Sequence, residues 1–194
     1  MKVITLSREY GAGGHSIGRE VAKRLGIEFY DKDIIRGVAE EMGVDYELIE
    51  KQGEEISRTD AFIRHITPIS YDQLNTMFEV EKEVIVSIAK KGPCVILGRC
   101  ANVTLAEAGI DCLNVFVYGD EVHRAHRVAD LINSKNPTEI SKALKKTDAN
   151  RHNYYTYHTG HRWGELKDYN LCVDSGILGY EACVDLICEA AKKI

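Results

Sequence analysis

A glycine-rich stretch near the N-terminus constrains this chain more than any other feature. Residues 3–6 are apolar, and residues 11–14 contain three glycines. Ile17, Val21 and Leu25 then recur at intervals of four, which places them on one face of a helix. Glycine permits positive φ angles and a close approach of the backbone to a ligand, and the N–H groups at a helix start can hold an anion. The order of strand, glycine turn and helix therefore predicts a phosphate-binding loop.

The loop lacks the lysine of the Walker A motif, G-x-x-x-x-G-K-[ST]. In two alternative alignments of that motif, the lysine position falls on His15 or on Gly14. Ser16 stands at the first turn of the expected helix, where its hydroxyl can cap the helix or reach a metal bound to phosphate. A glycine-rich turn without a ligand is the alternative that the loop alone leaves open.

The composition fits one domain over residues 1–194. Of the 194 residues 44% are hydrophobic, which is enough for a substantial core. A net charge of −5 argues against general nucleic-acid binding, and no apolar run is long enough to cross a bilayer. The chain begins with a strand pattern rather than a signal peptide, and its six cysteines form no C-x-x-C pair. We therefore expect a cytoplasmic protein with reduced cysteines.

Short apolar runs alternate with helical patterns along the rest of the chain. Further apolar runs occupy residues 27–30, 94–97, 113–118 and 170–173, and helical patterns occupy residues 71–91, 121–133 and 180–193. Buried parallel strands have this apolar character, and their crossovers are usually helices. The pattern predicts an α/β fold with a five-stranded parallel sheet flanked by helices. Ligands of such sheets bind at the carboxyl ends of the strands.

Two segments depart from this alternation. Residues 44–68 are polar and rich in charge, and we expect a helical insertion at the surface. Residues 145–167 lack an apolar stripe and concentrate tyrosine, histidine and arginine. Polar-aromatic segments of this kind are typical of mobile loops over active sites, so we expect a lid there.

Arginines stand where they can stabilise a transferred phosphoryl group. Arg99 follows Gly98 directly after an expected strand. Arg124 and Arg127 lie three residues apart on an expected helix and share a face, and Arg151 follows three residues after an aspartate in the expected lid. Phosphoryl transfer depends on cations aimed at the spreading charge. A lone surface arginine is more often a solvated charge, but an arginine after a glycine at a strand end seldom serves packing. The histidines show no zinc spacing.

These motifs resemble those of cytidylate kinases, and more closely those of the cytidylate kinase-like family of P-loop proteins. The matching segments are residues 7–14, Asp31-Lys32-Asp33, Leu97-Gly98-Arg99, Arg124-Ala125-His126-Arg127, Asp148-Ala149-Asn150-Arg151 and Val173-Asp174-Ser175. The resemblance runs nearly end to end and implies the fold of the nucleoside monophosphate kinase superfamily, with residues 44–68 on the acceptor side. It also implies that the Leu97-Gly98-Arg99 arginine binds the acceptor's phosphate, and that the Asp148–Arg151 segment binds the acceptor and the transferring phosphate. The missing lysine, Leu97 and the Asp31–Asp33 segment depart from the cytidylate kinase pattern, so the acceptor itself is not implied.

Two functions are compatible with these residues. The first is an ATP-dependent phosphotransferase that moves the γ-phosphate of ATP to a nucleoside monophosphate or a related small acceptor. In it, ATP binds at Gly11, Ala12, Gly13, Gly14, His15 and Ser16, with the Ser16 hydroxyl on Mg²⁺. Asp31, Asp33, Arg99 and Arg124 bind the substrate, and Arg127, Arg151 and Asp148 are catalytic. The second is a non-catalytic nucleotide sensor that keeps the kinase fold. Neither requires nucleic acid or a membrane, and self-association is left open.

Overall fold

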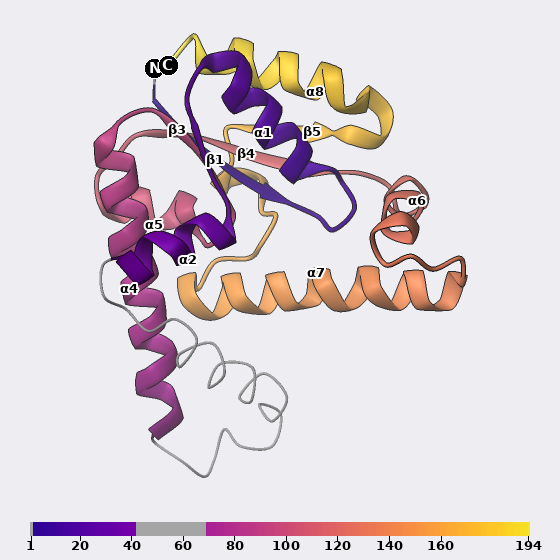
Figure 1. The fold of residues 1–194 in the computed structure, drawn as a ribbon, viewed down its shortest axis with the longest axis horizontal. Helices are drawn as coiled ribbons and strands as arrows, with labels where there is room; N and C mark the ends of the chain where they lie inside the picture. Colours follow the sequence, from indigo (N-terminus) through magenta and orange to yellow (C-terminus); the bar gives the residue numbers. More distant parts are fainter. Residues whose placement is uncertain (1, 42–68) are drawn as a thin grey trace.

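A computed structural model describes residues 2–41 and 69–194 and places parallel strands between two layers of helices (Figure 1). The strands of the described chain are β1 (Val3–Arg8), β2 (Glu28–Tyr30), β3 (Cys94–Leu97), β4 (Cys112–Tyr118) and β5 (Leu171–Asp174). They form a five-stranded sheet in the order β2-β3-β1-β4-β5, and every described pair is parallel. The predicted α/β fold and its five parallel strands are confirmed. β1 lies at the centre, so the glycine-rich loop that follows it leaves from the middle of the sheet.

Helices cover both faces of the sheet. The described helices are α1 (Gly14–Leu25), α2 (Lys32–Glu41), α4 (Ile69–Lys91), α5 (Ala101–Glu107), α6 (Glu121–Leu131), α7 (Pro137–Thr159) and α8 (Ser175–Ala191), with a short 3₁₀ helix η1 (Leu166–Asp168). Figure 1 shows α1 and α8 over one face and α2, α4, α5 and α7 on the side of the other. Helix α7 runs as one straight rod from the end of α6 toward α4.

Each face of the sheet has its own apolar core. On the α1 and α8 side, Ile4, Leu6 and Ile17 are almost completely buried. On the opposite side, Ile85 and Ile96 are buried equally well where α4 and α5 pack. Because both faces are covered, the strands carry the nearly continuous apolar runs seen in the sequence. This two-sided core fixes the carboxyl ends of β1 and β3 as a rigid platform.

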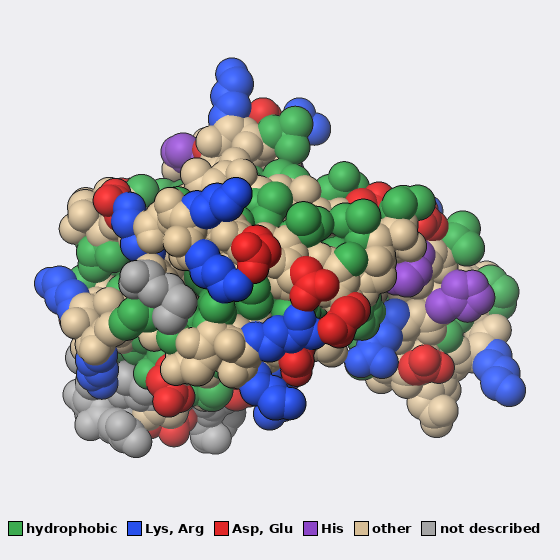
Figure 2. All heavy atoms as spheres, turned by 90° about the horizontal axis from the view of Figure 1, so that it is seen from above, with side chains coloured by type: hydrophobic (Ala, Val, Ile, Leu, Met, Phe, Trp, Pro, Cys, Tyr) green, Lys and Arg blue, Asp and Glu red, His purple; other side chains and the backbone are tan. Residues whose placement is uncertain are grey.

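The outer surface over α1 and α8 carries charged side chains beside exposed apolar ones, such as Ile177 and Leu186 of α8. Figure 2 shows this face from above, with acidic and basic side chains intermingled across its middle. Arg24 of α1 contacts Glu20 on its own helix and both Glu181 and Asp185 on α8. Charged groups thus link the two helices on the side away from the sheet. In the parts of the chain that the structure describes, no helix is both long and apolar enough to span a bilayer.

Residues 145–159, expected to lie in a mobile loop, belong instead to helix α7. The helix begins with a favourable cap, because the Asn136 side chain accepts a hydrogen bond from the Thr138 N–H and Pro137 fills the first turn. It ends at Gly160, which has a left-handed conformation. In place of an apolar stripe, His158, Asp148 and Arg151 make contacts with other elements of the fold. The segment 44–68, expected to be an insertion, lies outside the described residues.

Candidate active site

The glycine-rich loop turns sharply between β1 and α1. Gly11 and Gly13 have φ angles of 83° and 78°, which side chains with a Cβ rarely adopt. A Cβ added to Gly11 would lie 2.6 Å from the carbonyl oxygen of Arg124, and one added to Gly13 would lie 2.2 Å from the ring of Tyr180. Both positions therefore require glycine for conformation and for space. Helix α1 begins directly afterwards, at Gly14, with no side chain capping its first N–H groups.

His15 and Ser16 extend from the first turn of α1. His15 Nε2 lies 3.1 Å from Asp31 Oδ2, across the gap between this helix and the end of β2. The Ser16 side chain is exposed, and among the described residues its hydroxyl has no hydrogen-bond partner. Ala12 is buried, and its carbonyl oxygen accepts a hydrogen bond of 2.8 Å from Ser175. The uncapped helix start and the unengaged hydroxyl form a surface that can accept an anion and its metal ion.

Asp148 of α7 connects the glycine-rich loop to Arg124 of α6. One carboxylate oxygen accepts a hydrogen bond of 2.7 Å from the Tyr10 N–H, and the other accepts one of 2.6 Å from Arg124. Arg124 also donates to the carbonyl oxygens of Tyr10 and Gly119, at 3.1 and 2.9 Å. Asp148 and Arg124 thus brace the loop through partly buried charge-assisted hydrogen bonds. The structure brings these two sequence-predicted residues together at the loop's backbone.

Glu9 completes this brace from within the loop. It accepts a hydrogen bond of 3.2 Å from the Gly119 N–H and lies 3.4 Å from Arg124 Nε. Burial raises the pKa of Glu9 above its ordinary value, while the hydrogen bond from Gly119 and the charge of Arg124 act in the opposite direction. The loop is therefore preorganised by a network of partly buried charges before any ligand arrives.

The two arginines predicted to be catalytic lie in different surroundings. Arg151 of α7 donates a hydrogen bond of 2.9 Å to the carbonyl oxygen of Arg8 and lies over the Tyr10 ring, 5.6 Å from its centroid. Burial lowers the pKa of Arg151. Arg127 is exposed on α6 and has no hydrogen bond or ion pair with any described residue. The structure thus places Arg151 at the loop and Arg127 on the outer surface of its helix.

Arg99 stands at the end of β3 in a strained turn. Gly98, Arg99 and Cys100 have φ angles of 77°, 57° and 56°, all in the left-handed region. Two consecutive non-glycine residues in this region cost on the order of 1–3 kcal/mol each, and such strain concentrates at functional sites. The Arg99 guanidinium pairs with Glu81 of α4, whose side chain is fully buried. The Arg99 guanidinium also lies 4.6 Å from the centroid of the Tyr154 ring, so α7 covers it.

Asp31 and Asp33 begin helix α2 beside the same edge of the sheet. The Asp31 carboxylate accepts hydrogen bonds of 3.1 Å from the N–H groups of Asp33 and Ile34, as an N-cap does. Its second oxygen faces His15. The Asp33 side chain is exposed in the first turn. Asp31 therefore lies between the starts of α1 and α2.

An aromatic cluster docks the C-terminal half of α7 onto α4. The His158 ring stacks on Phe78 at 4.2 Å between centroids and lies 4.4 Å from Tyr154. The Tyr154 hydroxyl donates a hydrogen bond of 2.6 Å to Glu81. Burial, with the nearby charge of Arg99, lowers the pKa of His158 to about 4, so the imidazole is neutral at physiological pH. These contacts hold the C-terminal half of α7 against α4.

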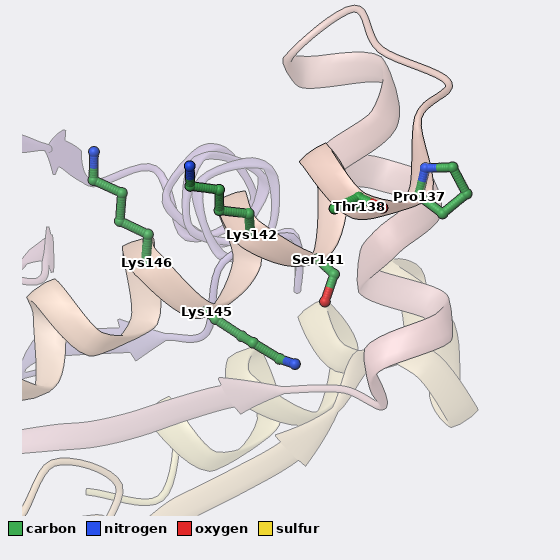
Figure 3. A pocket seen from close by; sticks show the side chains of 6 residues that line it. All are labelled: Pro137, Thr138, Ser141, Lys142, Lys145 and Lys146. Atoms are coloured by element: carbon green, nitrogen blue, oxygen red, sulfur yellow. The ribbon is translucent and has the colours of Figure 1, made fainter.

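A surface hollow of about 790 Å³ lies along the N-terminal half of α7 (Figure 3). It is lined by Pro137, Thr138, Ser141, Lys142, Lys145 and Lys146. Figure 3 shows Lys142 and Lys146 leaving the helix on one side, and Ser141 and Lys145 on the other. The three lysines are exposed and make no ion pair with described residues. No residue of the glycine-rich loop lines this hollow. We place the candidate site at the loop, where the uncapped start of α1 can accept an anion.

Sequence reasoning missed part of this site. It did not identify Glu81, which lies in an acidic stretch of α4 where nothing distinguishes a buried carboxylate from its exposed neighbours. Tyr10 and Glu9 were seen only as part of the loop motif, although both take part in the bracing network. Arg8 also lies within the matching segment 7–14, but its enclosure between two glycines emerges only in three dimensions.

Comparison with known proteins agrees with this geometry. A family model described as the cytidylate kinase-like family matches residues 3–177. Comparison with curated protein sequences finds no match. A solved structure of an uncharacterized protein from Eubacterium ventriosum is 20% identical, covers 100% of both chains and has a TM-score of 0.75.

Two shikimate kinase structures share the fold at lower similarity. The enzyme from Acinetobacter baumannii, solved with shikimate, is 15% identical, covers 100% of this chain and 94% of its own, and has a TM-score of 0.53. The enzyme from Bacteroides thetaiotaomicron is 15% identical over 98% of each chain, with a TM-score of 0.52. At these identities the likeness establishes a common fold, that of P-loop kinases.

Proposed function

The chain belongs to the cytidylate kinase-like family, and on that premise we propose that it transfers the γ-phosphate of ATP to a nucleoside monophosphate or a related small acceptor. Family membership and the P-loop kinase fold support an enzyme of this class, a kinase of a nucleotide or another small molecule. The observation that carries the proposal is the preorganised loop. Its left-handed glycines and uncapped helix start lie beside three arginines at the carboxyl ends of β1 and β3.

The donor phosphates are proposed to bind along residues 11–16. Glycine at positions 11 and 13 permits the left-handed turn that leads into α1, and the positive end of the α1 dipole favours an anion there. The brace formed by Asp148 and Arg124 holds the Tyr10 backbone, so the loop need not reorganise when phosphate binds. Positioning and electrostatics of this kind account for most of the catalysis in phosphoryl transfer.

The Ser16 hydroxyl fits the role of a magnesium ligand. Mg²⁺ typically keeps several waters and binds one or two protein oxygens together with substrate phosphates. Ser16 lies in the first turn of α1, exposed and without a partner among the described residues. When bound, the ion supplies charge neutralisation to the phosphates. The protein's part is to present this one hydroxyl at a fixed place.

The acceptor is proposed to bind between the ends of β2 and β3, under helix α7. Asp31 and Asp33 border this side at the start of α2, and Arg99 borders it at the end of β3. Arg151 reaches the backbone of the loop from α7, so this helix is placed to act as the lid. Closure of α7 over the loop excludes water, which protects the phosphoryl group from hydrolysis.

The reduced thiols and absence of a membrane-spanning helix in the described chain are compatible with action in the cytoplasm.

A thermal-shift panel of nucleoside mono-, di- and triphosphates with Mg²⁺ tests the proposal, followed by a transfer assay with the nucleotides that bind. We expect stabilisation by ATP and formation of ADP only when an acceptor is present. Tight ATP binding without transfer to any nucleotide, sugar or water would favour the nucleotide sensor instead. Failure to bind any triphosphate would exclude both functions.

A loop variant shows whether ATP binds where we propose. Gly13→Val adds a branched side chain at a left-handed position whose Cβ would overlap the Tyr180 ring, so ATP binding should be lost. Gly26→Val is the matched control, because Gly26 also has a positive φ, of 66°, but no neighbour within 4 Å and no place in the loop. Undiminished ATP affinity in a folded Gly13→Val protein, measured by titration calorimetry, would contradict the placement.

A further inference from the structure

Arg8, the last residue of β1, has a side chain enclosed by two glycines. A Cβ added to Gly14 would lie 2.6 Å from Arg8 Cβ, and one added to Gly98 would lie 2.5 Å from Arg8 Nη1. The stem of the arginine therefore runs along the start of α1, and its guanidinium ends against the turn that follows β3. Neither glycine can be replaced without displacing Arg8. The chain thus leaves space on both sides for this one side chain.

The enclosed guanidinium has no anionic partner among the residues that the structure describes. Among residues 2–41 and 69–194 it makes no hydrogen bond and no ion pair. Burial, and then the charges of Arg151 and Arg99, lower its pKa to about 9. Asp31 acts in the opposite direction, but its oxygens are already engaged by His15 and by backbone N–H groups of α2. Burying a charge without a partner is costly, and a charge kept in this way commonly serves a ligand.

The enclosed arginine occupies the space that the missing lysine would need. In the alignment that puts the lysine position of the P-loop motif on Gly14, any side chain there would collide with the Arg8 stem. A lysine would enter from the helix side of the loop, whereas Arg8 enters from the strand side. The two cations cannot occupy the loop together in this backbone.

We propose that Arg8 is the phosphate-binding cation of this loop, and that its guanidinium binds a phosphoryl group held between the glycine-rich loop and the turn after β3. A guanidinium presents its donors as a planar fork that matches two phosphate oxygens at once, which an ammonium cannot do. Arg151 holds the Arg8 carbonyl oxygen and so fixes the backbone from which the guanidinium extends. The inference deepens the proposed function and rests on it.

The experiment compares Arg8→Met and Arg8→Lys with the unmodified full chain, using thermal unfolding and titration with inorganic tripolyphosphate, inorganic phosphate and Mg·ATP. Arg19→Met is the matched control, because Arg19 is an exposed arginine of α1 without an ion pair to described residues. We expect Arg8→Met to weaken binding of the phosphate probes at least tenfold, Arg8→Lys to weaken it less, and Arg19→Met to leave it unchanged. Without ligand, Arg8→Met should unfold at the same or a higher temperature, because the change removes a charge that no described residue neutralises. If Arg8 had a purely structural role, Arg8→Met would unfold at a lower temperature than the unmodified chain.

A double variant provides an independent readout. Gly14→Lys alone should fail to bind tripolyphosphate because it collides with the Arg8 stem, whereas Arg8→Gly combined with Gly14→Lys should recover part of the binding that Arg8→Gly loses. Wild-type affinity of Arg8→Met for all three probes would overturn the inference and leave the proposed function standing. If the unmodified chain binds tripolyphosphate but not ATP, the proposed function is overturned and the inference about Arg8 is left standing. If Arg8→Met loses phosphate but keeps ATP, the bound group belongs to the acceptor; if it loses both ATP and tripolyphosphate, it belongs to the donor.

Discussion

The ends of two neighbouring strands, β1 and β3, each carry an arginine, and the two arginines are treated in opposite ways. Arg99 at the end of β3 pairs with the fully buried Glu81 and is covered by Tyr154. Arg8 at the end of β1 is enclosed to a similar extent but pairs with no described residue. The first charge is neutralised by a carboxylate of the fold, whereas the second meets no carboxylate in residues 2–41 and 69–194.

This difference changes how Arg99 should be interpreted. From sequence, Arg99 is expected to bind an anionic group of the acceptor. In the structure its guanidinium is engaged by Glu81, so it can meet an acceptor only with that pair in place or after exchanging partners. The pair holds the strained turn after β3 against α4 and α7. Arg99 is therefore proposed to shape the acceptor side, and Arg8 to supply the charge that an incoming phosphoryl group meets first.

Removing the partner of Arg99 should have the largest effect on stability. Glu81→Gln leaves the Arg99 guanidinium buried without its carboxylate, and breaking a buried pair in this way costs about 3–5 kcal/mol. Glu79→Gln is the control, because Glu79 lies on the same helix but pairs with Lys82 at the surface, where a pair is worth about 0–1 kcal/mol. Chemical denaturation measures both. Equal, small losses of unfolding free energy in the two variants would mean that the pair of Arg99 and Glu81 contributes no more than a surface pair. The arginines at the ends of β3 and β1 would then not differ as described.

Removing the arginine that reaches the end of β1 from α7 should affect turnover rather than binding. Arg151→Ala should leave ATP affinity within a few-fold but lower phosphoryl transfer by about 10²-fold, because a cation from the lid acts mainly in the transition state. Arg162→Ala is the control, since Arg162 is exposed beyond the end of α7. Paired calorimetry and turnover measurements on one preparation give both quantities. A loss of ATP affinity as large as the loss of turnover would place Arg151 in ground-state binding.

The smallest expected effect is a pH dependence on the β3 side. The pKa of His158 is lowered to about 4 in the folded protein, whereas an unfolded histidine titrates near about 6.5. Between these values the unfolded chain binds the extra proton, so stability falls as the pH drops from 6.5 to 4. Because His158 is partly exposed, the loss of unfolding free energy is on the order of 1 kcal/mol.

His158→Phe should keep the stacking on Phe78 and remove most of this acid-induced loss. Unfolding midpoints at pH 7 and pH 4.5 test the point, with His126→Gln as the exposed control. The same pH dependence in His158→Phe and in the wild type would show that another group titrates. It would also weaken the view that the β3 side is sealed by α7.

The sequence by itself determined the five strands and the first helix, and it predicted where the candidate site lies. Residues 94–97 were predicted as a strand and are β3 without change, and the run at 113–118 differs from β4 by one residue. These elements follow from short-range patterns: apolar runs for buried strands, a four-residue repeat for α1, and glycine where the backbone turns. Because ligands of parallel sheets bind at the carboxyl ends, the same patterns placed Gly11, Gly13 and Arg99 at one edge.

The tertiary structure alone decided how the charges at that edge are partnered. Residues 145–159 lack an apolar stripe, so their helical state depends on contacts with α4 and with the loop, through His158, Asp148 and Arg151. Glu81 meets Arg99 across 18 residues, and Arg124 meets Tyr10 across 114. Periodicity records only which side of its own element a residue occupies, while an ion pair depends on where two elements cross. That is why the sequence could predict a phosphate loop, and only the fold could show that Arg8, unlike Arg99, pairs with no carboxylate of the described chain.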